Sequence, residues 1–287
     1  VKPGEIVALI GENGAGKSTI MNILFGMPAI HQTGGFKGEV LIDGEKVNIK
    51  SPIEAMKYGI GMVHQEFMLI DGYDVAENIK LNRENLKNTP LSLLFGKRMN
   101  LVDQKTMHEE SRATLDSLGI ELSDQTRVGS LPVGYKQFVE IARELDKKNI
   151  KLIVLDEPTA VLTEKEAEQF LECVKKVAEK GIAFIFISHK LDEVKRYTHH
   201  TFVLRDGEMV GDYDTAELST IKMSELMVGR KVEILNRDIT EESADENQKA
   251  CLELEHFGVS MPGEVARDIT FSVKKGEIFG IGGLAGH

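Results

Sequence analysis

Residues 6–20 read IVALIGENGAGKSTI, and this stretch decides the fold of the chain. Its first five residues are all apolar, which is typical of a strand buried on both faces. The next eight, 11-GENGAGKS-18, satisfy the pattern G-x-x-x-x-G-K-[ST], and a helix is expected from Lys17 to about Phe25, where Gly26 stops it. Glycines let successive backbone N–H groups point at phosphate oxygens, and the helix N-terminus adds partial positive charge. The stretch therefore predicts a phosphate-binding loop between a strand and a helix.

The loop assigns roles to individual residues. The Lys17 ammonium is expected to neutralise the β- and γ-phosphates of a nucleotide, and the Ser18 hydroxyl is a predicted Mg²⁺ ligand. A plain strand–helix turn with a surface lysine is the alternative, but the strand before and the helix after the loop disfavour it. The predicted nucleotide contacts are Gly11, Glu12, Asn13, Gly14, Ala15, Gly16, Lys17, Ser18 and Thr19.

A second strand ends in two adjacent carboxylates. In 152-LIVLDEP-158, four apolar residues precede Asp156 and Glu157, and Pro158 stops the strand. An acid at the carboxyl end of a parallel strand lies where such sheets bind ligands. Asp156 is expected to hold Mg²⁺ directly or through water, and Glu157 to orient or deprotonate the attacking water. Two acids in a solvated turn are a common alternative for a lone Asp-Glu pair, but the phosphate loop disfavours it here.

Two further strands end in candidate polar residues. His189 follows the apolar run 184-FIFIS-188 and is expected to contact the γ-phosphate, a helix-capping or core histidine being the alternative. Gln65, in 61-GMVHQEF-67, is expected to coordinate Mg²⁺ or to position water while it links the sheet to a moving subdomain. The other histidines show no metal-ligand spacing and are interpreted as surface or packing residues: 31, 64, 108, 199, 200, 256 and 287.

Strands and helices alternate along residues 1–231, which favours an α/β fold with a mostly parallel sheet covered on both faces. The segments 39–49 and 202–211 each contain an Asp-Gly turn, which predicts a hairpin. The predicted strands are 6–10, 60–64, 152–156 and 183–188. The predicted helices are 17–25, one starting at Ser51 with Pro52 at its first position, 104–118, 135–148 and 164–179, the last with a capping box at Thr163 and Glu166. Residues 74–148 are expected to be mostly helical.

Composition excludes several classes of protein. The chain has 287 residues and a net charge of −11, and an acidic surface repels phosphate backbones, so no nucleic-acid partner is expected. Apolar runs such as 182–187 are far shorter than the roughly 20 residues of a membrane helix, so no transmembrane segment is expected. The two cysteines, Cys173 and Cys251, make neither a disulfide framework nor a metal site and fit a reducing compartment.

The two ends of the chain resemble each other. The opening 1-VKPGEIVALIGENGA-15 aligns with the close 273-VKKGEIFGIGGLAGH-287, and the identical positions are Val1, Lys2, Gly4, Glu5, Ile6, Gly11 and Gly14. Matches at glycines and charges disfavour chance similarity. We therefore expect two tandem copies of one domain, truncated at both ends: a first domain over 1–231, an acidic linker over 232–250, and the start of a second copy over 251–287.

The segment 130-SLPVGYKQFVEIAREL-145 completes the set of motifs, because Gly134 opens a helix directly ahead of the strand that carries Asp156. In this order the motifs resemble those of the ATP-binding-cassette (ABC) ATPases. The resemblance covers residues 1–231 and resumes after 251. It implies a P-loop NTPase fold with a mostly parallel sheet, an antiparallel β subdomain, and a helical signature subdomain at about 72–148.

The resemblance also implies how the motifs work together. Gly11–Ser18 corresponds to Walker A, Gln65 to the Q-loop, Asp156 and Glu157 to Walker B and the catalytic glutamate, and His189 to the switch histidine. The signature falls on Leu131, Pro132, Val133, Gly134 and Tyr135, and it acts in trans on the nucleotide of a second cassette. Pro132 removes the family's serine hydroxyl and an N–H donor, and Thr163 stands where the family usually carries Asp.

Within the family, 64-HQEF-67, 155-LDEPTAVLTEKE-166 and 226-LMVGRK-231 are similar to the ATPase subunits of bacterial simple-sugar importers, with a leaning toward nucleoside importers. The resemblance implies an ATPase that uses ATP and Mg²⁺ at the cytoplasmic face of the membrane as a peripheral subunit. Implied partners are permease subunits, a second cassette in the same full-length chain or in a homodimer, and indirectly a solute-binding protein. Alternatives are a translation- or DNA-associated ABC ATPase and a nucleotide-binding regulatory module.

Overall fold

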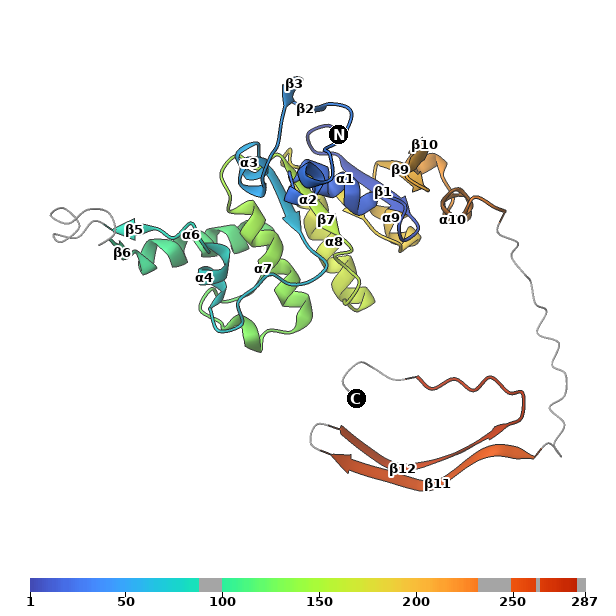
Figure 1. Cartoon of the computed structure of the whole chain (residues 1–287). Helices are drawn as coiled ribbons and strands as arrows, with labels where there is room; N and C mark the ends of the chain where they lie inside the picture. The colour runs from blue at the N-terminus through green and yellow to red at the C-terminus, as the bar shows by residue number, and fades with distance from the viewer. Residues whose placement is uncertain (88–99, 232–248, 262–263, 283–287) are drawn as a thin grey trace. The chain divides into compact units, whose positions relative to one another are not determined.

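The computed structural model describes residues 1–87, 100–231, 249–261 and 264–282 (Figure 1). The chain divides into two compact units, Val1–Val232 and Glu233–His287. Most of the predicted acidic linker, residues 232–248, lies outside the described residues. The predicted domain limits and the identity of the second unit stay predictions.

A six-stranded sheet forms the centre of the first unit, in the order β10-β9-β1-β8-β7-β4. Only the β9–β10 pair is antiparallel; the other four pairs are parallel, as the alternation of strands and helices predicted. The strands are β1 (Ile6–Gly11), β4 (Ile60–Val63), β7 (Leu152–Asp156), β8 (Ala183–Ile187), β9 (His200–Arg205) and β10 (Glu208–Asp214). Because β1, β4, β7 and β8 run the same way, their carboxyl ends share one edge of the sheet.

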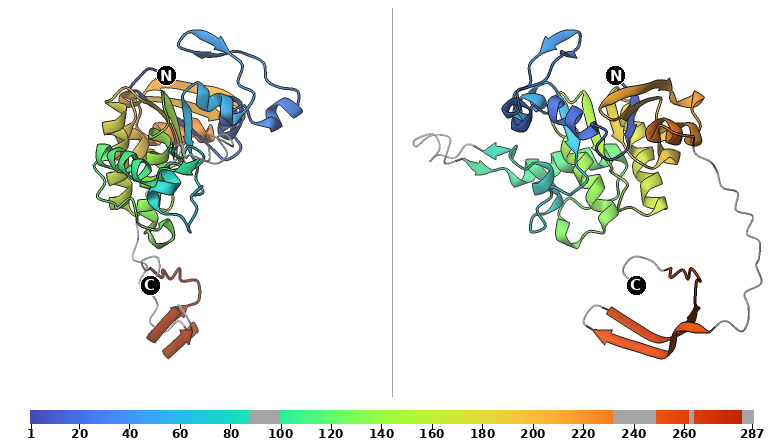
Figure 2. Two further views of the ribbon diagram at one scale, coloured as in Figure 1. Left: turned by 90° about the vertical axis from the view of Figure 1, so that its left-hand side faces the viewer. Right: turned by 45° about the vertical axis from the view of Figure 1, so that its right-hand side comes forward.

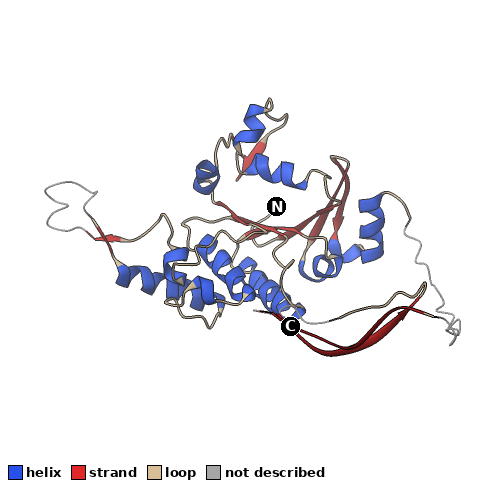
Figure 3. Cartoon of the chain, turned by 60° about the horizontal axis from the view of Figure 1, so that its bottom comes forward, coloured by secondary structure: helices blue, strands red, loops and turns tan. Residues whose placement is uncertain are grey.

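Helices cover both faces of this sheet (Figure 3). They are α1 (Lys17–Leu24), α2 (Pro28–Gln32), α3 (Pro52–Lys57), α4 (Val75–Ile79), α6 (Gln104–Leu118), α7 (Val133–Leu145), α8 (Glu164–Ala178), α9 (Leu191–Tyr197) and α10 (Thr220–Val228). Helices α4, α6 and α7 gather together beside the sheet (Figure 2), where the helical subdomain was predicted. Sequence patterns did not predict α2, α9 or α10.

Alternation along the strands divides the core into two layers. Ile6, Ala8 and Ile10 of β1 belong to a cluster that contains the apolar stripe of α8, whereas Leu9 belongs to a cluster with Met21 of α1. In α8 the buried positions recur at helical spacing: Ala167, Phe170, Leu171, Cys173, Val174, Val177 and Ala178. Every residue of β1 is buried, which explains why its sequence is uniformly apolar.

Local signals fixed several element boundaries. The side chains of Ser51, Asp74 and Thr163 each accept a hydrogen bond from a backbone N–H in the first turn of α3, α4 and α8. The predicted capping box of Thr163 and Glu166 is present. The Asp206-Gly207 turn joins β9 to β10 with φ of 52° and 83°, as a two-residue hairpin requires.

Short antiparallel pairs complete the first unit. Strands β2 (Val40–Ile42) and β3 (Glu45–Val47) pair across the predicted Asp43-Gly44 turn. Strands β5 (Leu86–Lys87) and β6 (Leu101–Val102) also pair, within a region predicted to be mostly helical. No sequence signal had indicated β5 and β6, because each contributes only two residues and the alternation test needs at least four.

In the described part of the second unit, β11 (Ala250–Met261) and β12 (Glu264–Lys274) form an antiparallel pair. The alternating segment that begins at Cys251 therefore forms a strand, as expected. Residues 277–282, which align with residues 5–10 of the first unit, have no regular structure here, and Ile278 is 96% exposed. In the first unit the matching segment is held between β8 and β9, and the described part of the second unit offers no such neighbouring strands.

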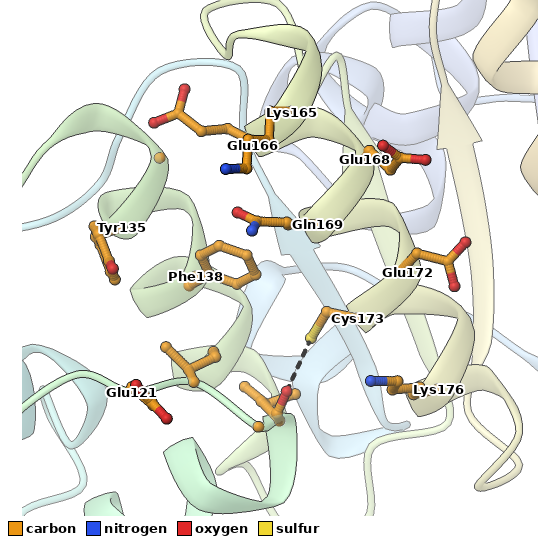
Figure 4. Close-up of a pocket in the computed structure, with 14 residues that line it drawn as sticks. Glu121, Tyr135, Phe138, Lys165, Glu166, Glu168, Gln169, Glu172, Cys173 and Lys176 are labelled. Carbon is orange, nitrogen blue, oxygen red and sulfur yellow. Dashed lines mark hydrogen bonds between the residues drawn. The ribbon is translucent and has the colours of Figure 1, made fainter.

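A groove of about 650 Å³ lies between α7, α8 and the turn after α6 (Figure 4). Phe138 and Cys173 face it, with Tyr135 at the N-terminal end of α7 and several charged side chains of α8 around it. The Cys173 thiol donates a weak hydrogen bond to the Leu118 carbonyl oxygen at 3.7 Å. Burial raises the pKa of Cys173 to about 11, so this thiol is a packing group.

Gly59 provides a test of the α3–β4 connection. Its φ is +83°, and an added Cβ would lie 2.3 Å from the Asn149 carbonyl oxygen, whereas Gly119 at the end of α6 has a similar φ of +69° and open space around it. We expect Gly59→Ala to lower the free energy of unfolding by about 1–3 kcal/mol more than Gly119→Ala. Urea unfolding of both variants measures the difference, and equal losses would contradict the crowding at Gly59.

The two cysteines are expected to differ in reactivity. Cys251 is exposed and Cys173 is buried. At pH 8 only about one Cys173 thiol in a thousand is ionised, so a thiol-specific chromogenic reagent should modify one cysteine quickly and the second only in denaturant. The Cys251→Ser variant should show no fast-reacting thiol, and rapid modification of that variant would show that the α7–α8 groove opens to solvent.

Candidate functional site

The glycine loop leaves β1 and turns directly into α1. Gly14 and Gly16 have φ of 84° and 103°, conformations that favour glycine, and Gly16 is the N-cap of α1. Apart from Gly14 and its two chain neighbours, no residue has an atom within 4 Å of the position that a Cβ of Gly14 would take. The first N–H groups of a helix have no partner within the helix, so this open loop presents free donors. The loop thus has the backbone form and the access that phosphate binding requires.

Lys17 closes the loop. Its Nζ donates to the carbonyl oxygens of Gly11 at 2.7 Å and of Glu12 at 3.0 Å. The Ala15 N–H donates to the same Glu12 carbonyl at 3.1 Å, which makes the loop a tight turn around the ammonium. The ammonium therefore lies inside the ring of loop residues that the sequence assigned to phosphate.

The β9–β10 hairpin supports this loop from behind. Gly207 donates its N–H to the Ala15 carbonyl at 3.2 Å, and Gly11 is paired with Leu204 of β9. A Cβ on Gly11 would lie 2.4 Å from the Leu204 carbonyl oxygen, so only glycine fits there. Sequence reasoning identified the Asp206-Gly207 turn as a hairpin but missed its contact with the loop, because the two segments are almost two hundred residues apart.

Asp156 ends β7 opposite Ile187 of β8. Burial raises the pKa of its carboxyl, the neighbouring charge of Glu157 adds to the rise, and the positive charges of His64 and Lys17 oppose it. Lys17 is thus close enough to act electrostatically on Asp156, although β8 lies between β1 and β7 in the sheet. The structure brings these two predicted residues to the same edge of the sheet.

Glu157 has an unusual backbone. Its φ of 47° is rare for a residue with a side chain, and its N–H donates to the Ile187 carbonyl at 2.9 Å. This turn directs the carboxylate toward β8, where Glu157 Oε2 lies 3.3 Å from Nδ1 of His189. The side chain of His189 is 61% exposed, so the imidazole is available to a ligand. Glu157 and His189, predicted from separate motifs, therefore form a pair.

A second layer of polar contacts joins the turns after β7 and β8. Lys190 Nζ donates to the Thr159 carbonyl at 2.7 Å, and the Thr159 hydroxyl donates to Glu193 Oε2 at 2.6 Å. Thr159 is buried. Sequence analysis did not single out these three residues. The sequence signal that could have identified them is their position shortly after β7 and β8, the two strands that precede predicted site residues.

Gln65 lies two residues beyond the end of β4 and is exposed. His64, interpreted from the sequence as a surface or packing residue, is partly buried next to the strand that carries Asp156. The register of β4 with β7 pairs Val63 with Leu155, so the next residues, His64 and Asp156, are neighbours. Burial lowers the pKa of His64, and the negative charges of Asp156 and Glu144 oppose this. His64 therefore belongs to the environment of Asp156.

The predicted signature begins α7. Pro132 is the N-cap of this helix, and Val133 and Tyr135 have exposed side chains. Gly134 is buried against α8, where a Cβ would lie 2.5 Å from Glu166 Oε1. Close packing of α7 against α8 thus explains why position 134 is a glycine. The exposed neighbours on either side remain free for the predicted action in trans.

The donors present fit a magnesium-bound nucleotide. Asp156 offers carboxylate oxygens and Ser18 a hydroxyl, which are ligands that Mg²⁺ accepts together with substrate phosphates. The described residues contain no cluster of three or more His, Cys, Asp or Glu side chains arranged for a metal. None of the helices in the described ranges has the length and apolarity needed to cross a membrane.

Solved structures share this architecture. A nucleotide-free ATP-binding cassette from an ABC transporter is 28% identical with a TM-score of 0.63, and the match covers 79% of this chain and 86% of that one. An ATP-binding cassette in its ADP conformation is also 28% identical with a TM-score of 0.63, over 80% of this chain and 86% of that one. The P-loop α/β fold predicted from the sequence is confirmed.

Curated relatives match over the whole chain. The galactose/methyl galactoside import ATP-binding protein of Fusobacterium nucleatum and the ribose import ATP-binding protein of Lacticaseibacillus paracasei are each 37% identical, covering 100% of this chain and 53% of the relative. A xylose import ATP-binding protein of Escherichia coli is 37% identical over 99% of this chain and 52% of the relative. The chain spans about half the length of these relatives.

The family model described as ABC transporter matches residues 1–160, which include the glycine loop, the signature and the Asp156–Glu157 pair. The match covers more than half of the chain and agrees with the fold and with the curated relatives. The chain belongs to the ABC transporter family of ATP-binding cassettes.

Proposed function

We propose that this chain binds ATP with Mg²⁺ at Gly11–Thr19 and that, paired with a second cassette, it hydrolyses ATP to drive import of a small solute through a membrane permease. The observation that carries the proposal is the convergence of Lys17, Asp156, Glu157 and His189 at one edge of the sheet. A cation for phosphate, a carboxylate for the metal and a carboxylate–imidazole pair for water are the groups that phosphoryl transfer to water needs.

Each residue has a role that follows from its position. Lys17 and the loop N–H groups hold the β- and γ-phosphates, and Ser18, Asp156 and Gln65 would hold Mg²⁺, which neutralises charge on the phosphates. Glu157 accepts the proton of the attacking water, and His189, 3.3 Å from it, donates toward the γ-phosphate. The mechanism also needs the signature of a second cassette, as the family resemblance implies, and the exposed Val133 and Tyr135 of this chain would serve the partner's nucleotide in the same way.

The solute is proposed to be a simple sugar or a nucleoside. The names of the matched relatives, which are import proteins for galactose, ribose and xylose, support the sugar. The Pro in the signature and the stretch 61-GMVHQEF-67 support the nucleoside. A solute-binding protein and permease subunits would then choose the solute, and the subunit would act at the cytoplasmic face of the membrane. The short acidic linker disfavours the translation-associated alternative, and the lack of a long heptad insertion in the sequence disfavours the DNA-associated one.

Glu157→Gln in the full-length subunit tests the assigned base. We expect ATP turnover to fall by about 10²-fold or more with Mg²⁺–ATP affinity retained, because the amide keeps the shape and loses the basicity. Lys17→Ala should instead weaken nucleotide binding. Glu179→Gln, an exposed acid at the end of α8, is the control and should leave both unchanged. Unchanged turnover in Glu157→Gln would remove the assigned base, and unchanged affinity in Lys17→Ala would remove the loop as the phosphate site.

Pro132→Ser tests the departure in the signature. Serine restores a hydroxyl and an N–H at the N-cap of α7, where the present residue makes no side-chain capping bond. We expect higher ATP turnover in the full-length subunit, because the nucleotide site that this signature completes gains two donors. Pro132→Ala, which restores the N–H alone, should give an intermediate rate. Equal turnover in all three proteins would show that Pro132 does not limit that site.

A further inference from the structure

Three charged residues, Glu140, Arg143 and Glu144, lie on the C-terminal half of α7, and a fourth, Lys147, follows two residues after its end. Two of the four are buried carboxylates. Glu140 is 0% and Glu144 is 2% exposed, and they pair with Arg143 and Lys147. A charged side chain is seldom fully buried unless it is paired, because removing one charge from water costs roughly several kcal/mol. These residues take no part in the proposed chemistry, so their burial needs another explanation.

The pair Glu140–Arg143 is hydrogen-bonded to the backbone of Met68, three residues after Gln65. Glu140 Oε1 accepts the Met68 N–H at 2.6 Å, and Arg143 Nη1 donates to the Met68 carbonyl at 2.6 Å. Arg143 Nη2 also donates to Glu140, so the two side chains and the peptide groups of Met68 form one closed network. Such charge-assisted bonds fix direction as well as distance. A shift of Met68 must therefore either move α7 with it or break these bonds.

The second carboxylate binds the chain just before Gln65. Glu144 Oε2 accepts the Met62 N–H of β4 at 3.1 Å. A Cβ on Gly61 would lie 2.4 Å from this oxygen, so a larger residue at position 61 would displace the Glu144 carboxylate from Met62. Helix α7 thus holds the backbone three residues before and three residues after Gln65.

The opposite end of α7 carries the signature. Tyr135 lies near its N-terminus with a side chain that is 41% exposed. Thirteen residues of helix span about 20 Å, so the ends are joined by a rigid rod. A displacement of the Gln65 segment therefore reaches the signature through the helix itself.

We propose that Glu140 and Arg143 are positioning residues that lock the segment around Gln65 to α7, so that a change at the nucleotide moves the signature end of the helix. This inference rests on the proposed function, because nucleotide binding is the event that displaces Gln65. Without the lock, the loop and the helix move independently, and the signature no longer responds to ATP.

The chain has no tryptophan, which permits a direct test in the 287-residue protein. Met68→Trp and Tyr135→Trp each place one fluorophore on a side chain that is 53% or 41% exposed. Titration with Mg²⁺–ATP is followed by emission from each reporter, and ATP affinity is measured separately by calorimetry. In the parent reporters we expect both positions to respond.

Glu140→Leu and Arg143→Met are then introduced into each reporter chain. We expect the response at position 135 to fall by about fivefold or more while ATP affinity and the response at position 68 persist. Glu140→Gln should restore most of the lost response, because its amide oxygen still accepts the Met68 N–H, a rescue that general loss of stability would not give. Lys80→Met, which breaks a buried ion pair with Asp146 in the same helical group, is the matched control and should change neither reporter.

A full response at position 135 in either Glu140→Leu or Arg143→Met would overturn the inference. If circular dichroism shows that Glu140→Leu does not fold, Arg143→Met decides. ATP binding by the parent chain with no response at position 135 would also overturn the inference while the proposed function survives. Absence of ATP binding by the parent chain would remove both.

Discussion

Parallel pairing of β1, β8, β7 and β4 is the constraint on which the rest of this structure depends. Because the four strands run the same way, the residues that follow them all leave the sheet at one edge. The glycine loop, the Glu157 turn, His189 and Gln65 are separated by up to 178 residues of sequence, yet each begins within two residues of the end of one of these strands. The buried side chains of β1 in turn need helices on both faces of the sheet.

Close backbone approaches hold the loop in place. Gly11 lies against the Leu204 carbonyl, and Gly207 donates to the Ala15 carbonyl, so the β9–β10 hairpin fixes the loop from the side opposite its open face. Gly11 is crowded by β9, whereas the Cβ position of Gly14 has open space, so the loop is held on the sheet and stays accessible to a ligand at Gly14. The loop is thereby preorganised, since its geometry does not have to form when the ligand binds.

Charged side chains at the sheet edge and charged side chains on α7 differ in their exposure. At the sheet edge, Lys17, Asp156, Glu157 and His189 are partly accessible, as reacting groups must be. In α7, Glu140 and Glu144 are buried, and each accepts a hydrogen bond from a backbone N–H in or just after β4. The site and α7 thus both contain carboxylates with basic partners. The carboxylates of the site are accessible to a ligand, whereas those of α7 are buried and bonded to the backbone, which distinguishes reactive groups from positioning groups.

The sequence alone determined the order of strands and helices, the glycine loop, the capping boxes and the candidate residues, because these depend on local spacing and on backbone conformations that few residue types adopt. Tertiary structure decided what local patterns do not contain. It set the strand order and the place of His64 beside Asp156. It also set the hydrogen bond from Gly207 to the loop and the bonds of Glu140 and Arg143 to Met68. Each of these is a contact between segments distant in the chain. Such contacts depend on register and packing, which a single sequence leaves open because many partners would satisfy the same local pattern.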